Sequence, residues 1–372
     1  MTAARSLRPA QRLRPQKNNR PPPAVTEKVT IALDAMGGDS APAVVVRGAA
    51  LAARHDADIH FIFFGDEARI APLIAAEPAL AGRHEVVHTD SVVAPEDKPS
   101  VALRNRRTSS MRLAIDAVKA GRAEAVISAG NTGALLAIAK FVLRTLPGIE
   151  RPAIATVLPN ARDASVVLDL GANIDCDVVN LVQFAIMGSV FAQIVLGKEK
   201  PTVGLMNVGA EEMKGDEKLR EAAACLRELP LPGSFYGFVE GDAIGAGPVD
   251  VIVTDGFTGN VALKAVEGTS RLLKQFIGEA FRSSFIARIG YLVSSGAMRR
   301  LRARMDPRRY NGALFLGLSH VCVKSHGGTD TFGFSQAIKV AADLVRKRCN
   351  ERIGERLAQM GDIHYAQKAG NP

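Results

Sequence analysis

The sequence predicts an α/β fold in which a mostly parallel sheet is covered by helices on both faces. Six segments share one pattern, in which a short apolar and often β-branched run is followed by Asp, Asn or Ser together with Gly. Most of these segments lead into sequence with helical periodicity, and strands that alternate with helices form parallel sheets that are buried on both faces. With 372 residues and 47% hydrophobic content, the chain can form one large α/β domain or two smaller ones.

The expected elements follow from this pattern in order. Strands are expected at 29–33, up to Gly65, up to Ser128, at 165–168, up to Asn207 and at 249–254. A helix is expected at 109–120, because two serines can cap it, its apolar residues share one stripe, and Gly121 ends it. A second amphipathic helix is expected at 217–229. These helices fill the connections between successive strands, as an α/β fold requires.

Charge and cysteine content limit the setting of the protein. The net charge is +9, and residues 1–26 hold six Lys and Arg and no acidic residue, so we expect a disordered basic tail there. This tail lacks the apolar core of a secretory signal, and we expect no run as long as the ~20 apolar residues of a membrane-spanning helix. Isolated cysteines favour a reducing, cytoplasmic setting over a disulfide framework or a zinc site; they are Cys176, Cys225, Cys322 and Cys349.

The Gly-rich turns after the strands are the candidate functional site. Ligands of open parallel sheets bind outside the carboxyl ends of the strands, so we expect these turns to converge on one rim. A Gly-rich turn that opens a helix presents backbone N–H groups to an anion such as phosphate, and the turns at 128–133 and 255–260 both have this form. Cations in or near the turns could assist, namely Lys98, Arg104, Arg107, Lys214 and Lys324.

Several familiar catalytic patterns are missing from the sequence. It contains no P-loop, no G-x-G-x-x-G dinucleotide fingerprint and no G-x-S-x-G nucleophile elbow. A protein whose substrate is itself an anionic nucleophile needs none of these, because it has only to position the anion and hold the charge that develops on the attacked carbonyl. The missing nucleophile patterns are therefore compatible with a substrate that is itself an anion, such as inorganic phosphate. Nucleic acid is not expected as a partner, since no aromatic residues alternate with the arginines between 282 and 309 in an RNP-like pattern.

Eight ordered blocks make the chain resemble the bacterial phosphate acyltransferases of the PlsX type. The blocks are DAMGGDSAP (34–42), KPSVALR (98–104), SSMR (109–112), SAGNTGA (128–134), LDLGAN (168–173), MNVGAEEMKGD (206–216), TDGFTGNVALK (254–264) and LGLSHVCVKSHGGTD (316–330). The resemblance covers about residues 28–345. It implies a three-layer α/β/α sandwich similar to phosphotransacetylases and isopropylmalate dehydrogenases, in a domain at 27–350 followed by a C-terminal extension at 351–372.

The resemblance also implies an activity and its partners. Inorganic phosphate would take the fatty acyl group from acyl carrier protein, and the acyl phosphate would feed a membrane glycerol-3-phosphate acyltransferase in phospholipid synthesis. The family members are homodimers that lie in the cytoplasm, peripherally at the membrane, and need no organic cofactor; no metal is expected either. A positive protein suits an acidic carrier protein, because complementary charge raises the rate of association.

Site residues carry over from the matching blocks. For catalysis the resemblance points to Lys214, which would stabilise charge, together with Asn207 and Asp255. The expected phosphate- and substrate-binding residues are Asp34, Gly37, Gly38, Asp39, Ser128, Gly130, Asn131, Thr132, Glu212, Thr258, Gly259, Asn260, Lys324 and His326.

The segment 270–305 is expected to be helical and amphipathic. Between 276 and 305, many apolar residues recur at spacings of three or four with arginines between them, as in a helix that lies in a membrane interface. The residues expected to enter the membrane are Phe281, Phe285 and Ile289. A helix that packs in a dimer interface or in the core would give the same spacing, and the sequence leaves that alternative open.

Three other functions share part of this pattern. A phosphotransacetylase acting on acetyl-coenzyme A has the same fold logic, although the long amphipathic segment favours a fatty acyl substrate. A metal-dependent 2-hydroxy acid dehydrogenase would need a D-x-x-x-D ligand helix, which the sequence lacks. A lipid- or carrier-binding module without enzymatic activity would require the Gly-rich turns to be purely structural.

Overall fold

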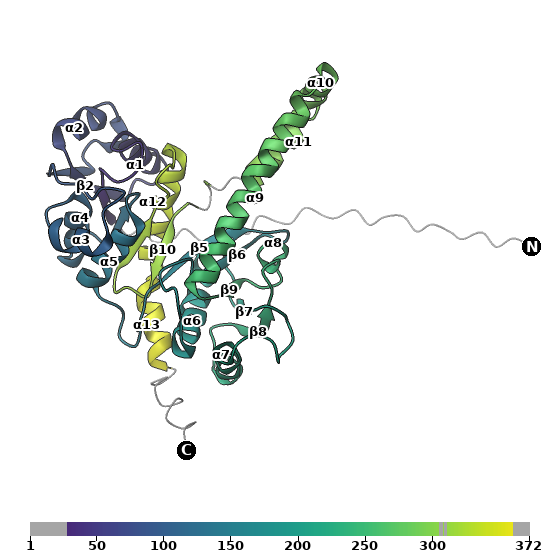
Figure 1. Cartoon of the computed structure of the whole chain (residues 1–372). Coiled ribbons are helices and arrows are strands. Elements are labelled where there is room, and N and C mark those ends of the chain that lie inside the picture. The colour runs from purple at the N-terminus through teal and green to yellow at the C-terminus, as the bar shows by residue number, and fades with distance from the viewer. Residues whose placement is uncertain (1–27, 305–307, 309–310, 360–372) are drawn as a thin grey trace, which may run out of the picture.

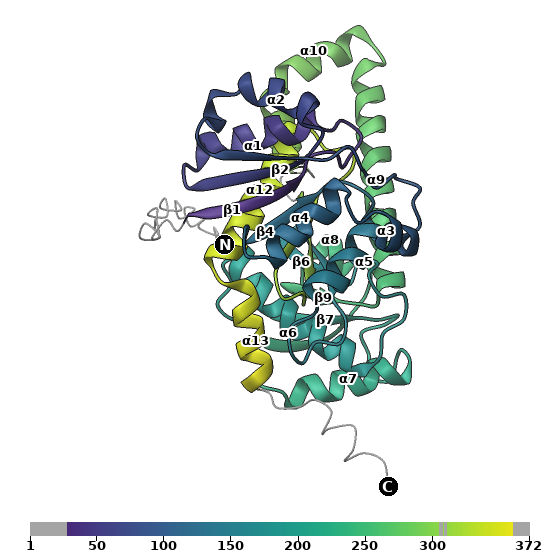
Figure 2. The ribbon, with the colours of Figure 1, turned by 90° about the vertical axis from the view of Figure 1, so that its left-hand side faces the viewer.

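The structure is a computed structural model that describes residues 28–304, 308 and 311–359. Its centre is an 11-stranded sheet in the order β3-β2-β1-β4-β11-β10-β5-β6-β9-β7-β8 (Figures 1 and 2). The predicted basic tail at 1–26 and most of the predicted extension lie outside the described residues. The strands are β1 (Val29–Asp34), β2 (Ile59–Gly65), β3 (His84–His88), β4 (Ala125–Ser128), β5 (Ala153–Pro159), β6 (Ala164–Leu168), β7 (Thr202–Met206), β8 (Ser234–Val239), β9 (Val251–Val253), β10 (Ala313–Leu316) and β11 (Val321–Lys324).

Helices cover both faces of this sheet, so the fold has three layers (Figure 1). One face packs against α1 (Ala43–His55), α2 (Glu67–Ala75), α6 (Val178–Val195), α7 (Glu217–Glu228), α12 (Thr331–Arg346) and α13 (Cys349–Gln359). The other face packs against α3 (Pro99–Asn105), α4 (Ser110–Lys119), α5 (Thr132–Leu143), α8 (Ala243–Ala246) and the start of α9 (Gly256–Arg282). A short 3-10 helix, η1 (Pro78–Leu80), precedes β3. The predicted α/β/α class is therefore confirmed.

Two sets of parallel strands run in opposite directions. Strands β1, β2, β3, β4 and β11 are parallel to one another, as are β6, β7, β8 and β9. Between the sets, the pairs β11/β10, β10/β5 and β5/β6 are all antiparallel. Because three reversals separate the sets, their carboxyl ends point to opposite edges of the sheet. The prediction that all the Gly-rich turns converge on one rim is wrong for this reason.

The α6 helix fills the core beneath the second set of strands. It is capped by Asp177, whose carboxylate accepts a hydrogen bond from the backbone N–H of Asn180. By length and composition α6 could cross a membrane, which corrects the expectation that no run is long enough. Most of its side chains are buried inside the protein, however, and Gly188 lets it approach the sheet, since a Cβ there would lie 2.7 Å from a methyl of Val251. The α6 helix is therefore a core helix of this fold.

A helical arm projects from the body (Figures 1 and 2). It consists of α9, then α10 (Phe285–Val293) and α11 (Ser295–Arg304), so the described part of the predicted helical segment at 270–305 forms three successive helices. Ala262 and Leu263, near the start of α9, pack against the core, whereas α10 has no buried residue. The arm thus extends well beyond the core that anchors it.

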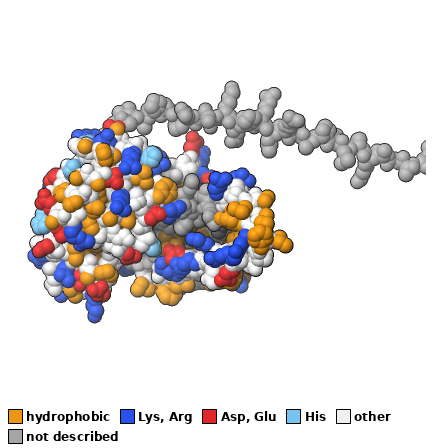
Figure 3. Space-filling model, turned by 90° about the horizontal axis from the view of Figure 1, so that it is seen from above, with side chains coloured by type: hydrophobic (Ala, Val, Ile, Leu, Met, Phe, Trp, Pro, Cys, Tyr) orange, Lys and Arg blue, Asp and Glu red, His pale blue; other side chains and the backbone are white. Residues whose placement is uncertain are grey.

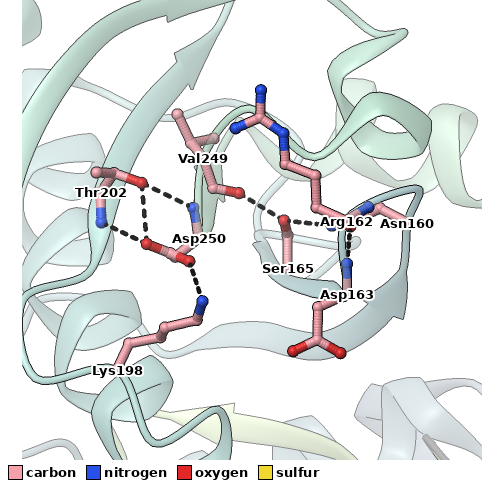
Figure 4. A network of polar contacts seen from close by, with 8 residues as sticks. All are labelled: Asn160, Arg162, Asp163, Ser165, Lys198, Thr202, Val249 and Asp250. Carbon is pink, nitrogen blue, oxygen red and sulfur yellow. Dashed lines mark hydrogen bonds and ion pairs between the residues drawn. The ribbon is translucent and has the colours of Figure 1, made fainter. Parts of the chain in front are cut away.

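A polar network ties the amino ends of β6, β7 and β9 together (Figure 4). The Asp250 carboxylate accepts hydrogen bonds from the backbone N–H and the hydroxyl of Thr202 at 2.9 and 3.0 Å. The Ser165 hydroxyl donates to the Val249 carbonyl at 2.5 Å and accepts from the Asn160 amide at 2.9 Å. These bonds satisfy polar groups at one sheet edge and leave the opposite ends of the same strands to the functional turns.

The predicted elements match the observed ones closely. The Ser109 hydroxyl caps α4 as expected, accepting from the N–H of Arg112 at 3.3 Å, and α7 begins at the predicted residue. The predicted boundary at residue 350 falls inside α13. Ile353 and Leu357 of this helix are buried in the same core as α6, so the packed structure continues to the end of the described chain.

Candidate active site

The first rim lies at the carboxyl ends of β1, β4 and β11. Asp34 ends β1, and its buried carboxylate accepts hydrogen bonds of 2.6 Å each from the hydroxyls of Ser110 and Ser128. Burial raises the pKa of Asp34 above its ordinary value, and the two serine hydrogen bonds and the charge of Lys324 act against this rise. The buried Asp34 carboxylate therefore holds together the carboxyl ends of β1 and β4 and the start of α4.

Two glycines after β1 let the neighbouring turns interlock. A Cβ at Gly37 would lie 2.5 Å from the Asp34 carboxylate and 2.8 Å from the Gly130 nitrogen. Gly38 has a φ of +104°, which disfavours any side chain. The turn after β1 can thus sit directly against the turn after β4. Both glycines were predicted for the site, and packing alone requires them.

Lys324 ends β11 and reaches between these two turns. Its ammonium donates to the carbonyl of Ala129 at 3.3 Å and to the carbonyl of Ser325. Desolvation lowers its pKa to about 8, although the charges of Asp34 and Asp39 oppose this shift. A half-buried cation with an unusually low pKa at the carboxyl ends of parallel strands is a typical feature of a functional site.

The turn at 128–132 leads directly into α5. The Asn131 side chain caps the helix by accepting from the N–H of Ala134 at 3.0 Å, and its amide donates to the carbonyls of Pro95 and Asp97. Because the first N–H groups of a helix have no partner within the helix, those of the first turn at Thr132 and Gly133 point outward. The Asn131 side chain is engaged with its own chain, so the backbone N–H groups are the better candidates to hold an anion here.

The remaining predicted residues of this rim lie beside β11. The N–H of Asp39 donates to the carbonyl of Gly327 at 3.0 Å, and the exposed His326 ring accepts from the N–H of Gly328 at 3.1 Å. Asn311 holds this loop, because it accepts from the N–H of His326 and donates to the hydroxyl of Ser325. Sequence reasoning missed Ser110, Ser325 and Asn311 as site residues. Ser110 and Ser325 lie in the blocks SSMR and LGLSHVCVKSHGGTD, whereas Asn311 lies in none of the eight blocks.

The second rim lies at the carboxyl ends of β6, β9 and β7. The turn at 255–260 packs tightly against the loop at 169–173, since a Cβ at Gly259 would lie 1.9 Å from the Asp169 carbonyl oxygen. The N–H of Gly256 donates to the Asn173 carbonyl at 2.7 Å, and Asp255 caps α9 by accepting from the N–H of Thr258. The N–H groups of Gly256 and Thr258 are therefore used by the chain itself, and close packing accounts for Gly256 and Gly259. Binding by Thr258 and Asn260 stays a prediction.

The loop beneath this turn is organised by Asp169. Its buried carboxylate accepts from the backbone N–H groups of Ile154, Ala172 and Asn173 at 2.7–3.0 Å. Burial raises the pKa of Asp169, and these hydrogen bonds oppose the rise. Asp169 therefore holds the loop in place, as a positioning group rather than an open binding group.

Asn207, Glu212 and Lys214 share the turn after β7. Asn207 is buried and donates to the carbonyl of Lys214 at 3.0 Å, which closes the turn. Lys214 itself is exposed, and Glu212 forms an ion pair with Arg227 at 2.8 Å. The structure thus places Lys214 on the rim opposite Lys324, and its predicted role in charge stabilisation stays a prediction.

The two rims differ in what they can do chemically. The first rim combines the amino end of α5 with a half-buried ammonium, which together suit a phosphate-sized anion; its serine hydroxyls are buried and hold Asp34. In the second rim, two of the N–H groups at the amino end of α9 are already bonded within the chain. Among the described residues, no group of three or more His, Cys, Asp and Glu side chains could hold a metal ion.

Solved structures with this architecture place the protein in a class. A phosphotransacetylase from Streptococcus pyogenes superposes with a TM-score of 0.57 at 17% identity, covering 86% of this chain and 94% of that chain. The EutD phosphotransacetylase from Staphylococcus aureus gives a TM-score of 0.54 at 16% identity over the same shares. The protein is therefore an α/β protein with the phosphotransacetylase fold.

Sequence relatives narrow this class to a family. The profile of the family described as "Fatty acid synthesis protein" matches residues 29–352. The phosphate acyltransferase of Rhodospirillum centenum is 59% identical over 336 residues, covering 90% of this chain and 95% of that protein. That of Rhodospirillum rubrum is 57% identical, covering 90% and 96%. The chain belongs to the PlsX-type phosphate acyltransferase family, and it is an acyltransferase enzyme.

Proposed function

We propose that the enzyme transfers a fatty acyl group from acyl carrier protein to inorganic phosphate, and that phosphate attacks the thioester directly. The observation that carries this proposal is the first rim. There the amino end of α5 and the Lys324 ammonium meet at the carboxyl ends of β4 and β11. Such a site holds an anion by backbone N–H groups and one cation, and the bound anion can itself act as the nucleophile.

The reaction balances without a covalent enzyme intermediate. An oxygen of hydrogen phosphate forms a bond to the thioester carbonyl carbon, and the carbon–sulfur bond then breaks. The thiolate leaves and takes the proton that hydrogen phosphate gives up, so the products are acyl phosphate and the free carrier thiol. The N–H groups and Lys324 would lower the barrier by holding the phosphate in place and stabilising the charge of the tetrahedral intermediate.

The proposed setting is the cytoplasmic surface of the membrane. Exposed apolar side chains gather on α10, with Phe285, Ile286 and Val293 exposed by 76%, 81% and 83%. Seen from above, hydrophobic side chains collect at the end of the arm with Lys and Arg beside them (Figure 3). This arrangement suits peripheral contact with anionic lipid. A membrane-bound glycerol-3-phosphate acyltransferase would then receive the acyl phosphate where it is made.

A homodimer is the proposed assembly. The α9 helix carries a stripe of exposed apolar side chains, which a second copy of the chain could cover; the stripe comprises Phe257, Val261, Val266, Leu272, Leu273 and Phe276. The reaction as written uses no organic cofactor. The alternative donor acetyl-coenzyme A has no comparable need for an apolar membrane contact.

A turnover assay tests the reaction. Purified protein is given inorganic phosphate and palmitoyl-acyl carrier protein, with palmitoyl- and acetyl-coenzyme A in parallel, and both acyl phosphate and free thiol are measured. Direct attack predicts equal amounts of the two products and no thiol release when phosphate is omitted. Stoichiometric thiol release without phosphate would instead reveal an acyl-enzyme. Product from acetyl-coenzyme A alone would identify a phosphotransacetylase, and none from any donor would overturn the proposal.

A further inference from the structure

The carboxyl end of α5 borders a basic depression on the protein surface. This depression has a volume of about 330 Å³ and is lined by Ala137, Lys140, Phe141, Arg144 and Thr145. Lys140 and Arg144 are both exposed, and neither forms an ion pair within the part of the chain that the structure describes. It therefore offers two free positive charges around a concave surface.

An exposed aromatic ring lies beside one of these charges. The Phe141 side chain is 53% exposed, and the Arg144 guanidinium lies 5.5 Å from the centre of its ring. Arg144 ends α5 with a φ of +67° and a ψ of 171°, a conformation that is otherwise almost confined to glycine. Interfaces are rich in aromatic residues and arginine, so an exposed phenylalanine with an arginine beside its ring suits a binding surface.

The place of this depression relative to the first rim identifies the partner. The same helix begins at the anion-binding turn, and its 12 residues span about 18 Å. A donor that docks at the far end of α5 must carry its thioester on an arm long enough to cover this distance. Carrier proteins deliver acyl groups on such an arm, and they are acidic, so their surface complements Lys140 and Arg144.

The basic surface continues beside α5. Helix α3 packs along α5 on the outside of the sheet (Figures 1 and 2), and a Cβ at Gly133 would lie 2.8 Å from the Pro99 ring. Lys98 before α3, Arg104 on α3 and Arg107 after it are all exposed. Further exposed cations thus lie on and around α3, whose first residue lies against the start of α5 at the first rim.

We propose that the depression formed by Ala137, Lys140, Phe141, Arg144 and Thr145 is the docking point for the acidic acyl carrier protein. This inference rests on the proposed function, because it assigns a surface to the donor in that reaction. Docking there places the body of the carrier at the end of α5 and directs its acyl arm along the helix to the first rim. The charges of Lys140 and Arg144 attract the carrier, and Phe141 gives an apolar contact beside them.

Charge reversal at the depression tests the proposal. The double variant Lys140→Glu/Arg144→Glu should raise the KM for palmitoyl-acyl carrier protein by on the order of tenfold, and weaken binding of the carrier without its acyl group by a similar factor. The KM for phosphate and the turnover of palmitoyl-pantetheine, which has the same thioester but no protein, should not change. The control is Arg47→Glu/Lys200→Glu, an equal charge change at exposed sites on α1 and before β7, which should leave all constants unchanged.

A third variant separates folding from docking. Phe141→Ser keeps the charge, and it should raise the KM for the carrier donor alone, with an unchanged melting temperature. An unchanged carrier KM and affinity in the charge-reversed variant, while the wild type turns over the carrier thioester, would overturn the docking proposal. An altered oligomeric state of the charge-reversed variant would also overturn it, since the surface would then contact a second copy of the chain. Failure of the wild type to use the carrier thioester would count against the proposed function instead.

Discussion

At the scale of single residues, the first rim depends on a carboxylate and an ammonium that are both withdrawn from water. Asp34 is kept in place by Ser110 and Ser128, and it lies close enough to Lys324 for each charge to stabilise the other. Opposite charges placed near each other in this way add little to stability by themselves, because desolvation of the two groups offsets their attraction. Instead, the attraction holds Lys324 between the two turns, where its ammonium can bind an anion.

The pH dependence of phosphate binding tests the role of Lys324. Its pKa of about 8 means that the ammonium is charged below this pH and neutral above it. The KM for phosphate should therefore rise by about tenfold per pH unit once the pH exceeds about 8. Lys324→Met should bind phosphate weakly at every pH and lose this dependence. Steady-state kinetics between pH 6.5 and 9.5 measure both.

Stability should respond to pH in the opposite direction. The folded-state pKa of Lys324 is below its unfolded value, so the unfolded chain binds more protons between about pH 8 and 10.5, and this residue's contribution to the free energy of unfolding rises through that range. A rise in KM with no loss of melting temperature thus points to Lys324, whereas a parallel loss of both would indicate general unfolding. A flat KM up to pH 9.5 would contradict the assignment.

At the scale of elements, the arm from α9 to α11 combines two surfaces. Phe281 was expected to enter a membrane, but it is half-buried and packs edge-on against Tyr291, with ring centres 5.2 Å apart. This contact joins α9 to α10. Phe285 and Ile289 are exposed as the prediction requires, together with Ile286, Leu292 and Val293. The spacing in the sequence could not separate these roles, because a residue between two packed helices and one facing lipid have the same periodicity.

Vesicle binding tests the outward face of α10. Phe285→Ser/Ile286→Ser removes two large exposed side chains and should reduce partitioning onto anionic vesicles by at least about tenfold, given roughly 1.5–3 kcal/mol for burying each such side chain. Binding by the wild type should also fall as salt increases, because the arm carries arginines. Sedimentation with vesicles measures both effects.

The matched control for α10 lies elsewhere on the surface. Ile174→Ser/Val208→Ser replaces two side chains that are exposed to the same extent, 75% and 79%, and it should bind vesicles like the wild type. An equal loss of vesicle binding in the two double variants would show that any exposed apolar residue contributes to membrane binding. That result would remove the special role of α10.

At the scale of the whole molecule, the sequence shows which segments are strands but not which way they run. The strands at β1, β2, β4, β6, β7 and β9 were predicted from their apolar runs, and helices α4 and α7 from their periodicity. Strands β5 and β10, which reverse the sheet, were not. An apolar run reads the same in either direction, so only the connections reveal the reversal. The Pro159-Asn160 turn between β5 and β6 was the one local signal.

Missing the strand reversal affects the prediction of the site more than the prediction of the fold. The Asp34, Ser128 and Lys324 turns come together as expected because they end neighbouring parallel strands. Lys214 and Asp255 end strands of the other set, and the missed reversal separates them from that rim. Burial and cross-strand hydrogen bonds decided which turns stay open, and neither can be read from residue types alone. Asn131, for example, has the composition of a ligand-binding residue, but its side chain is used to hold the loop at 95–97.

The exposed stripe on α9 determines the last prediction, the assembly of the whole molecule. The helix has 27 residues, so it is about 40 Å long, and its apolar residues lie along one side while Arg271 and Lys274 lie along the other. A stripe of this length can supply the roughly 800 Å² per partner of a stable interface. Leu272→Glu/Phe276→Glu should therefore convert a particle of twice 39.5 kDa into one of 39.5 kDa in light scattering. Arg271→Glu/Lys274→Glu changes the opposite side of the same helix and should remain dimeric. If both variants keep the larger mass, or if the wild type already has the smaller one, α9 is not the contact between two copies.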